Sequence, residues 1–319
     1  MRVTMVKAHI NMQHFLVLVA SITVVVATAA VGVDFIPVPG GQMRPRSCIH
    51  EVASGTRIHE ADDGMMTVTE PGKPPRILPT CNTTTGLVGR AMRGSAWKTW
   101  AQLKPGDATS VTALSNQWKV PPNPTKNNNQ VLYYWNGVED GGSSGGTGVL
   151  QPVLQFGQST PNAWGIKSWY VGSGGTVTSP VVKLKTGDIV TGKMAQQLDG
   201  SWICIGVAEF NSGNWSKAST LHYTGTNEKK FTYAYTAVLE AYHVYTDASE
   251  YPSSGSVAFT KTQLEFDGVK VSPPFQWDNC FCPDPSCGKC EDPTGGQLGE
   301  KTTTSDNGEN VTIHWNTAV

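Results

Sequence analysis

Two short apolar strings in the sequence each carry one polar residue that can do chemistry. Gln155 lies in the run 149–157 (VLQPVLQFG), and Glu240 lies in the run 235–242 (YTAVLEAY). A carboxylate can take a proton from water, and a primary amide can donate a hydrogen bond to the oxyanion that forms when this water attacks a carbonyl group. The pair therefore predicts hydrolysis by an activated water, without a metal ion or a covalent intermediate.

A rigid scaffold must position both runs, and the sequence over residues 96–275 predicts strands. Short apolar or alternating segments rich in Val, Thr, Tyr and Trp are separated by Gly, Asn, Asp and Ser, and no long stretch has a helical apolar stripe. This spacing predicts one all-β domain built as a two-sheet antiparallel β-sandwich, of the concanavalin-like jelly-roll type. Gln151 is two alternations away from Gln155 and is expected to face the same cleft, although Pro152 leaves the local register open.

The start of the sequence has the pattern of a secretory signal peptide. Arg2 and Lys7 precede a nearly apolar run over residues 15–26, and the small residues 27–30 (ATAA) follow it. Because apolar character continues to Val33, a membrane anchor is the alternative. We expect residues 1–30 to be removed and the mature protein to be secreted and extracellular, without attachment to a membrane.

Composition divides the rest of the chain. Every arginine lies at or before Arg93, and residues 31–95 are rich in Pro, Gly, Thr and charge, with no sustained period of 2 or 3.6. These residues are expected to be a propeptide or loosely folded leader that is processed near Arg90 or Arg93, with an ordinary N-terminal extension as the alternative. The β-sandwich is expected over residues 96–275, and residues 276–319 are expected to be a cysteine-containing, partly disordered tail.

Secretion favours disulfides over metal binding for the seven cysteines. The tail pattern C-x-C-x4-C-x2-C over residues 280–290 lacks the two separated C-x2-C pairs of a zinc ribbon, so no metal site is expected. Since the number of cysteines is odd, one thiol is left over, and Cys204 in a strand-like apolar run is expected to be buried and free. Asn82, Asn214 and Asn310 stand in N-x-[S/T] sequons and are candidate glycosylation sites.

Charge and motifs exclude several classes of function. The formal net charge is −1 and the predicted domain has no basic stripe, so nucleic acid is not an expected partner. The sequence contains no G-x-S-x-G, H-E-x-x-H, P-loop or Rossmann pattern, and only His222 and His243 lie in the predicted domain. We therefore expect no cofactor.

In order and spacing, three motifs resemble those of the glutamic peptidases of the eqolisin family, which are fungal acid proteases. The W-x-G-[I/V]-[D/E] segment of the family has its counterpart in residues 135–139 (WNGVE), the L-Q-x-G strand in residues 154–157 (LQFG), and the glutamate strand in residues 239–242 (LEAY). This resemblance covers about residues 96–270. A more distant similarity connects the chain with the neprosin-like peptidases, which use two glutamates.

The resemblance implies a secreted acid endopeptidase that acts as a monomer on protein or peptide substrates, and it implies a role for each site residue. Glu240, ionised near its ordinary pKa, is expected to act as general base and then to protonate the leaving amine. Gln155 is expected to position the water and to stabilise the oxyanion. Trp135, Glu139 and Trp169 are expected to support the site or to bind substrate, with Glu139 hydrogen-bonded near the pair.

Two other functions remain open from the sequence. A two-sheet sandwich is also the scaffold of lectins and of some glycanases, and in a carbohydrate-binding protein Gln155 and Glu240 would have no joint role. A secreted sandwich without catalytic activity is the other alternative. It is favoured by residues 164–170 (WGIKSWY), which lack the glutamate of the W-Y-E-W string that is usual in the family.

Overall fold

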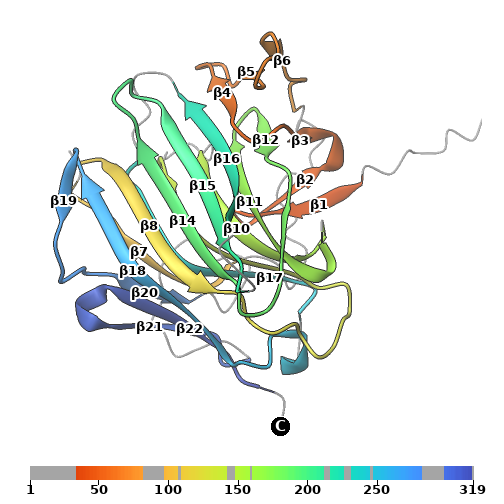
Figure 1. Cartoon of the computed structure of the whole chain (residues 1–319), viewed down its shortest axis with the longest axis vertical. Helices are drawn as coiled ribbons and strands as arrows, with labels where there is room; N and C mark the ends of the chain where they lie inside the picture. Colours follow the sequence, from red (N-terminus) through yellow and green to blue (C-terminus); the bar gives the residue numbers. More distant parts are fainter. Residues whose placement is uncertain are drawn as a thin grey trace, which may run out of the picture. The chain divides into compact units, whose positions relative to one another are not determined.

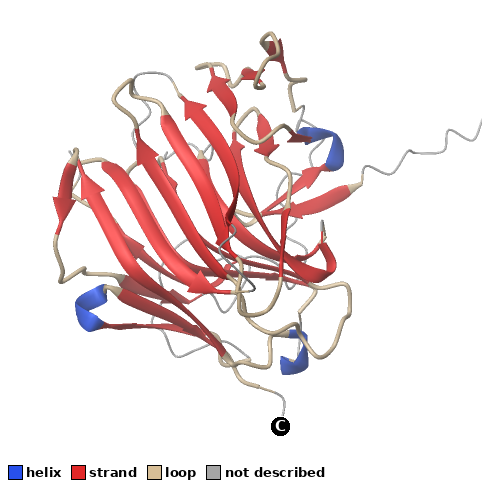
Figure 2. Cartoon of the chain, in the orientation of Figure 1, coloured by secondary structure: helices blue, strands red, loops and turns tan. Residues whose placement is uncertain are grey.

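The computed structural model describes residues 34–81, 97–106, 109–141, 148–158, 160–211, 216–225, 231–244, 247–281 and 298–317. Strands make up nearly all the regular structure in these ranges, as Figure 2 shows. Three short 3-10 helices interrupt them: η1 (Arg46–Cys48), η2 (Ala248–Glu250) and η3 (Asp306–Gly308). The all-β fold expected from the sequence is confirmed.

Two large sheets form the sandwich (Figure 1). The first sheet has nine described strands, of which eight follow the order β20-β7-β17-β9-β10-β11-β12-β3, while β13 pairs with β11. The bounds of these strands are β3 (Ile49–Glu51), β7 (Trp97–Leu103), β9 (Val131–Glu139), β10 (Val149–Gly157), β11 (Thr160–Gly172), β12 (Gly175–Thr178), β13 (Val182–Leu184), β17 (Tyr233–Tyr242) and β20 (Asp278–Phe281).

The second sheet has eleven described strands, of which ten follow the order β21-β22-β18-β8-β14-β15-β16-β4-β5-β6, while β19 pairs with β18. Their bounds are β4 (Thr56–Glu60), β5 (Met66–Thr69), β6 (Arg76–Ile77), β8 (Val111–Lys119), β14 (Ile189–Gln196), β15 (Trp202–Glu209), β16 (Ser216–Thr224), β18 (Ser256–Phe266), β19 (Val269–Val271), β21 (Lys301–Ser305) and β22 (Asn310–His314). A separate hairpin joins β1 (Phe35–Val38) to β2 (Gln42–Pro45).

Alternating side chains on β10 separate two apolar clusters. Leu150 and Leu154 belong to the large cluster between the sheets, together with Trp118 of β8. Val149 and Val153 belong to a second cluster. Because successive side chains of a strand point to opposite faces of its sheet, this second cluster lies on the face of the nine-stranded sheet that is turned away from the core. We call this surface the outer face.

Residues 34–81, at the start of the described chain, are folded onto both sheets. β3 pairs in parallel with β12, and β4 pairs in parallel with β16, whereas all other pairings among the described strands are antiparallel. A disulfide joins Cys48 to Cys81. The expectation of a loosely folded leader is thus corrected, because strands of three to five residues are too short to give a sustained period. Removal of this segment by processing stays a prediction.

The C-terminal segment also contributes strands. β20 pairs with β7 at the edge of the nine-stranded sheet, while β21 and β22 extend the other sheet from β18. The sandwich therefore continues past the expected boundary at residue 275. Cys204 is buried and free as predicted, and Cys280 is disulfide-bonded. Cys282, Cys287 and Cys290 lie outside the described residues.

Candidate active site

A bulge in β17 directs Glu240 to the outer face. Tyr235 belongs to the outer-face cluster, and so do Val238 and Tyr242, whereas Ala237 and Leu239 face the core between the sheets. The register of β17 on β9 shifts between Tyr235 and Val238, and Ala237 has φ +50. Without this extra residue the side-chain alternation would turn Glu240 into the apolar core.

The Glu240 carboxylate is completely buried and has four hydrogen-bond partners. Its Oε1 accepts from the indole Nε1 of Trp135 (2.8 Å) and from the backbone N of Gly40 (2.7 Å). Its Oε2 accepts from the backbone N of Gly41 (3.1 Å) and lies 3.2 Å from the hydroxyl of Tyr242. Donors surround both oxygens, which favours the ionised form.

Burial outweighs these donors. Loss of solvation raises the pKa of Glu240 to about 7, although the amides of Gly40 and Gly41, Trp135 and Tyr242 each act to lower it. The expectation that Glu240 has an ordinary pKa is therefore wrong for this structure, in which Gly40 and Gly41 cover the carboxylate. Burial, and second the charge of Glu240, raise the pKa of the Tyr242 hydroxyl well above its usual value, so that this group stays a proton donor.

Gln155 lies in one row with Glu240 across three strands. It pairs with Tyr133 of β9, and Tyr133 pairs in turn with Glu240 on β17. Directly paired residues share a face, so both predicted catalytic residues lie on the outer face. Tyr133, on the strand between them, shares this face. The Gln155 amide is buried and has no hydrogen-bond partner among the described residues.

Gln151 is a second amide on the same face, and it is the one nearest to the partners of Glu240. A methyl group placed on Gly40 would lie 3.7 Å from Gln151 Nε2. A methyl group on Gly137 would lie 3.2 Å from the Cβ of Gln151 and 2.8 Å from the ring of Trp135. The Gln151 amide is likewise buried without a described partner. In the sequence, the even spacing of Gln151 and Gln155 on one strand was the signal that both side chains share a face.

The three predicted supporting residues have different environments. Trp135 contacts Glu240 directly, as described. Trp169 pairs with Gln151 on β11, and Lys167 Nζ lies 5.4 Å from the centre of its ring. Glu139 lies at the far end of β9, where it accepts a hydrogen bond from the hydroxyl of Tyr235 (2.6 Å). Trp135 thus lies beside Glu240 and Trp169 lies beside Gln151. Glu139, which was expected near the catalytic pair, is instead hydrogen-bonded to Tyr235 of the aromatic cluster.

Sequence reasoning missed the partners that complete the carboxylate site. Tyr242 follows Glu240 by two residues, and this strand spacing could have shown that both share a face. Gly40 and Gly41 carried a turn signal, and both have positive φ, +101 and +74. Nothing in the sequence connects this turn with a glutamate some 200 residues later.

Within the part of the chain that the structure describes, no three or more His, Cys, Asp or Glu side chains lie together in a group that could hold a metal ion. Of the three candidate glycosylation sites, Asn310 lies in β22, where its side-chain amide donates a hydrogen bond to the Asp306 carboxylate. Asn82 and Asn214 lie outside the described residues, as does the expected signal peptide. None of the described helices has the length and apolar character needed to cross a bilayer.

Fold and site together define a two-sheet β-sandwich with a buried carboxylate and two buried amides on one sheet face. The structure is similar to scytalido-glutamic peptidase with a transition state analog inhibitor, at 16% identity and a TM-score of 0.45, over 70% of this chain and 99% of the other. It is also similar to SCP-B, a member of the eqolisin family of peptidases in a complex with the tripeptide Ala-Ile-His, at 15% identity and a TM-score of 0.43 with the same coverage. No protein-family model and no curated protein matches the sequence. The function must therefore be argued from this chain's own residues.

Proposed function

We propose that the chain is a peptidase that hydrolyses peptide bonds with Glu240 as general base. The observation that carries this proposal is the buried carboxylate of Glu240, which shares one sheet face with two buried amides whose hydrogen-bonding groups have no described partner. A carboxylate and an amide in one desolvated site are the two groups that water-mediated acyl transfer requires.

The reaction follows from these groups. Ionised Glu240 removes a proton from a water molecule as the water oxygen attacks the carbonyl carbon of the substrate. A glutamine N–H donates to the oxyanion that develops on the carbonyl oxygen. When the tetrahedral species collapses, the C–N bond breaks and Glu240 returns its proton to the leaving nitrogen. Trp135 holds the carboxylate in place through its indole N–H.

The oxyanion donor is Gln155 in the proposal that the family motif supports. Gln151 is a second candidate, because it lies beside Gly40 and Gly137 and thus next to the groups that contact Glu240. Loss of one oxyanion donor typically slows the reaction by about a hundredfold to a thousandfold, whereas loss of a neighbouring side chain that only packs costs less. Single alanine substitutions therefore distinguish the two residues.

Cleavage of a denatured protein between about pH 2 and 6 tests the proposal. The chain is assayed after release of its N-terminal segment, as the wild type and as Gln155→Ala, Gln151→Ala and Glu240→Gln variants. Gln196→Ala is the matched control, because Gln196 is exposed on β14. We expect activity that resists metal chelators and serine and cysteine reagents, is lost in Glu240→Gln and falls in one glutamine variant. Glycan binding by a folded chain that cleaves nothing would instead favour the carbohydrate-binding alternative.

The remaining expectations belong to this proposal. A signal peptide at residues 1–30 and the sequons at Asn82, Asn214 and Asn310 support a secreted, extracellular glycoprotein. We further expect it to act on proteins or peptides as a monomer, which size-exclusion chromatography tests. Mass spectrometry of the secreted protein tests the signal-peptide cleavage through its N-terminus and the glycosylation through its glycan masses. Retention of residues 1–30 would contradict secretion by a cleaved signal peptide.

A further inference from the structure

The tip of the β1–β2 hairpin lies on the proposed general base. The backbone N–H groups of Gly40 and Gly41 donate to the two oxygens of Glu240, at 2.7 and 3.1 Å. Both glycines have positive φ, a conformation that other residues adopt only with strain, and this turn brings two successive amides to one carboxylate. Glu240 is 0% exposed in this arrangement.

Side chains of the outer face also hold the strand that leads into this turn. The hydroxyl of Tyr133 lies 3.0 Å from the carbonyl oxygen of Pro37, and the hydroxyl of Tyr242 lies 3.2 Å from that of Val38. The Val38 side chain is fully buried in the outer-face cluster. The outer face therefore binds main-chain groups of an extended segment, which is how a site binds polypeptides of varied sequence.

These contacts are incompatible with catalysis by Glu240. A general base must reach a water molecule at hydrogen-bond distance, and here peptide N–H groups and the Trp135 and Tyr242 side chains surround both carboxylate oxygens. A substrate carbonyl would also have to approach Gln151 at the position that Gly40 takes.

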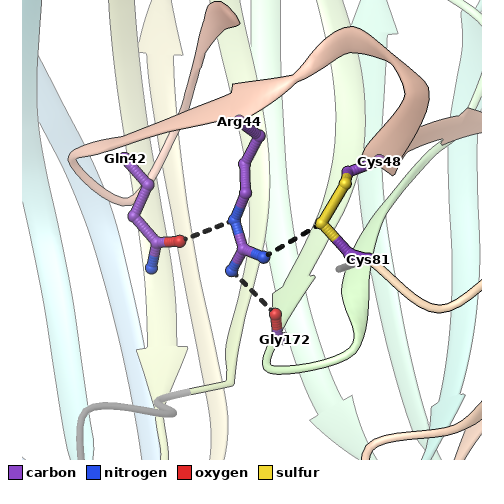
Figure 3. The surroundings of a disulfide bond; sticks show 5 residues. All are labelled: Gln42, Arg44, Cys48, Cys81 and Gly172. Atoms are coloured by element: carbon purple, nitrogen blue, oxygen red, sulfur yellow. Dashed lines mark hydrogen bonds between the residues drawn. A yellow bond between two sulfur atoms is a disulfide. The ribbon is translucent and has the colours of Figure 1, made fainter. Parts of the chain in front are cut away.

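Further contacts fix the hairpin to the sheet. Arg44 of β2 donates through Nη2 to the carbonyl oxygen of Gly172 (2.9 Å) at the end of β11, and through Nε to Gln42 (2.9 Å), beside the Cys48–Cys81 disulfide (Figure 3). Burial lowers the pKa of this guanidinium, which Glu60 partly opposes. The buried Arg44 and the two parallel strand pairings thus hold the segment on the sheets, and the disulfide joins two of its own residues.

The same unit has no covalent tie to the sandwich except the chain itself. Both cysteines of residues 34–81 are bonded to each other. One cut between residues 82 and 96 would therefore leave the segment attached only by hydrogen bonds and packing, and able to dissociate.

We propose that residues 35–45 are an internal, substrate-like blocker of the site and that the described chain is the latent form of the enzyme. The inference rests on the proposed function for its inhibitory effect. The covering contact on Glu240 can be tested independently of activity.

The test uses the full chain with a recognition site for a specific protease placed between residues 82 and 96. Gly40→Pro removes one N–H donor to Glu240 and cannot adopt φ +101. Gly72→Pro is the matched control, because Gly72 also has positive φ and lies in a turn of the same segment with open space around it. We expect the uncut wild type and Gly72→Pro to be at least about tenfold less active than the cut chain, and uncut Gly40→Pro to recover activity.

Hydrogen exchange of residues 35–45 supplies the second measurement, in the uncut wild type and in Glu240→Gln. Exchange is followed above about pH 7, where the covered Glu240 is ionised. Neutralising the acceptor there should speed exchange in this segment about tenfold or more, while residues 56–69 remain unchanged. An uncut wild type as active as the cut chain, or exchange that does not depend on Glu240, overturns the proposal. If no form cleaves protein but exchange does depend on Glu240, the hairpin contact stands and the peptidase proposal fails.

Discussion

At the residue scale, two opposing effects set the pKa of Glu240: desolvation raises it, and four hydrogen-bond donors lower it. Desolvation prevails, so the covered carboxyl has a pKa of about 7. Any uncovering that returns water to the site removes the largest cause of this shift. The hairpin therefore changes both the access to the base and its protonation.

The pH dependence of stability should report this shift. The pKa of Glu240 is raised in the folded chain above its ordinary value of 4.5, so the folded state binds the proton more tightly. The resulting stability is complete below about pH 4.5 and is lost as pH rises to about 7, by about 3 kcal/mol in total. Urea denaturation of the uncut wild type and Glu240→Gln should differ by this slope. Parallel curves would show that Glu240 titrates normally.

Removing the indole donor should raise the same pKa further. Trp135→Phe keeps a ring in the aromatic cluster but loses the 2.8 Å hydrogen bond to Glu240. We expect the acid limb of the rate profile of the cut chain to move to higher pH and kcat/KM to fall roughly tenfold to a hundredfold. Trp100→Phe is the control, since Trp100 belongs to the same cluster but its Nε1 donates to Gln102. Equal effects of both substitutions would assign Trp135 to packing alone.

At the element scale, β17 shows where sequence patterns stop being informative. The run was predicted as a strand, and both residues of the proposed catalytic pair, Gln155 and Glu240, lie on strands as expected. The face of Glu240, however, depends on the bulge at Ala237, and an alanine in the left-handed region has no sequence signature, unlike a glycine. The strands of the N-terminal segment were missed because each is short and gains its order from pairing with a distant strand.

Strain at the bulge can be measured with two alanines of β17. Ala237 and Ala241 are both fully buried in the core cluster, but only Ala237 has positive φ. Replacement by glycine removes one methyl group in each case, while it relieves backbone strain only at Ala237. We expect Ala241→Gly to lower the free energy of unfolding by about 1 kcal/mol more than Ala237→Gly does. Equal losses in thermal or urea denaturation would mean that the bulge is unstrained.

At the scale of the whole molecule, one segment connects folding with control of the site. The sandwich class and the strands that carry Gln155 and Glu240 could be predicted, because alternation and composition are local signals. The odd number of cysteines predicted one free thiol, which is Cys204. The cover on Glu240 could not be predicted, since it joins Gly40 to a residue two hundred positions away and only the folded sheets bring them together.

The disulfide should stabilise this cover. It closes a loop with a sequence separation of 33, and in the chain-entropy account a loop of this size contributes about 3 to 4 kcal/mol. The double variant Cys48→Ser with Cys81→Ser should therefore release residues 34–81 faster after cleavage of the chain. Size-exclusion chromatography of the cut protein would follow the release. Unchanged retention of the segment would show that strand pairing alone holds it.

The proposal that Glu240 is the general base of a peptidase is tested most directly by the kcat/KM of the cut chain for a denatured protein, measured for wild type and for Glu240→Gln. Glu209→Gln serves as the control, because Glu209 is exposed at the end of β15. We expect Glu240→Gln alone to lose activity, by a factor of at least about a thousand. Undiminished hydrolysis in that variant, or no hydrolysis by a folded wild-type chain free of residues 34–81, would contradict the proposal.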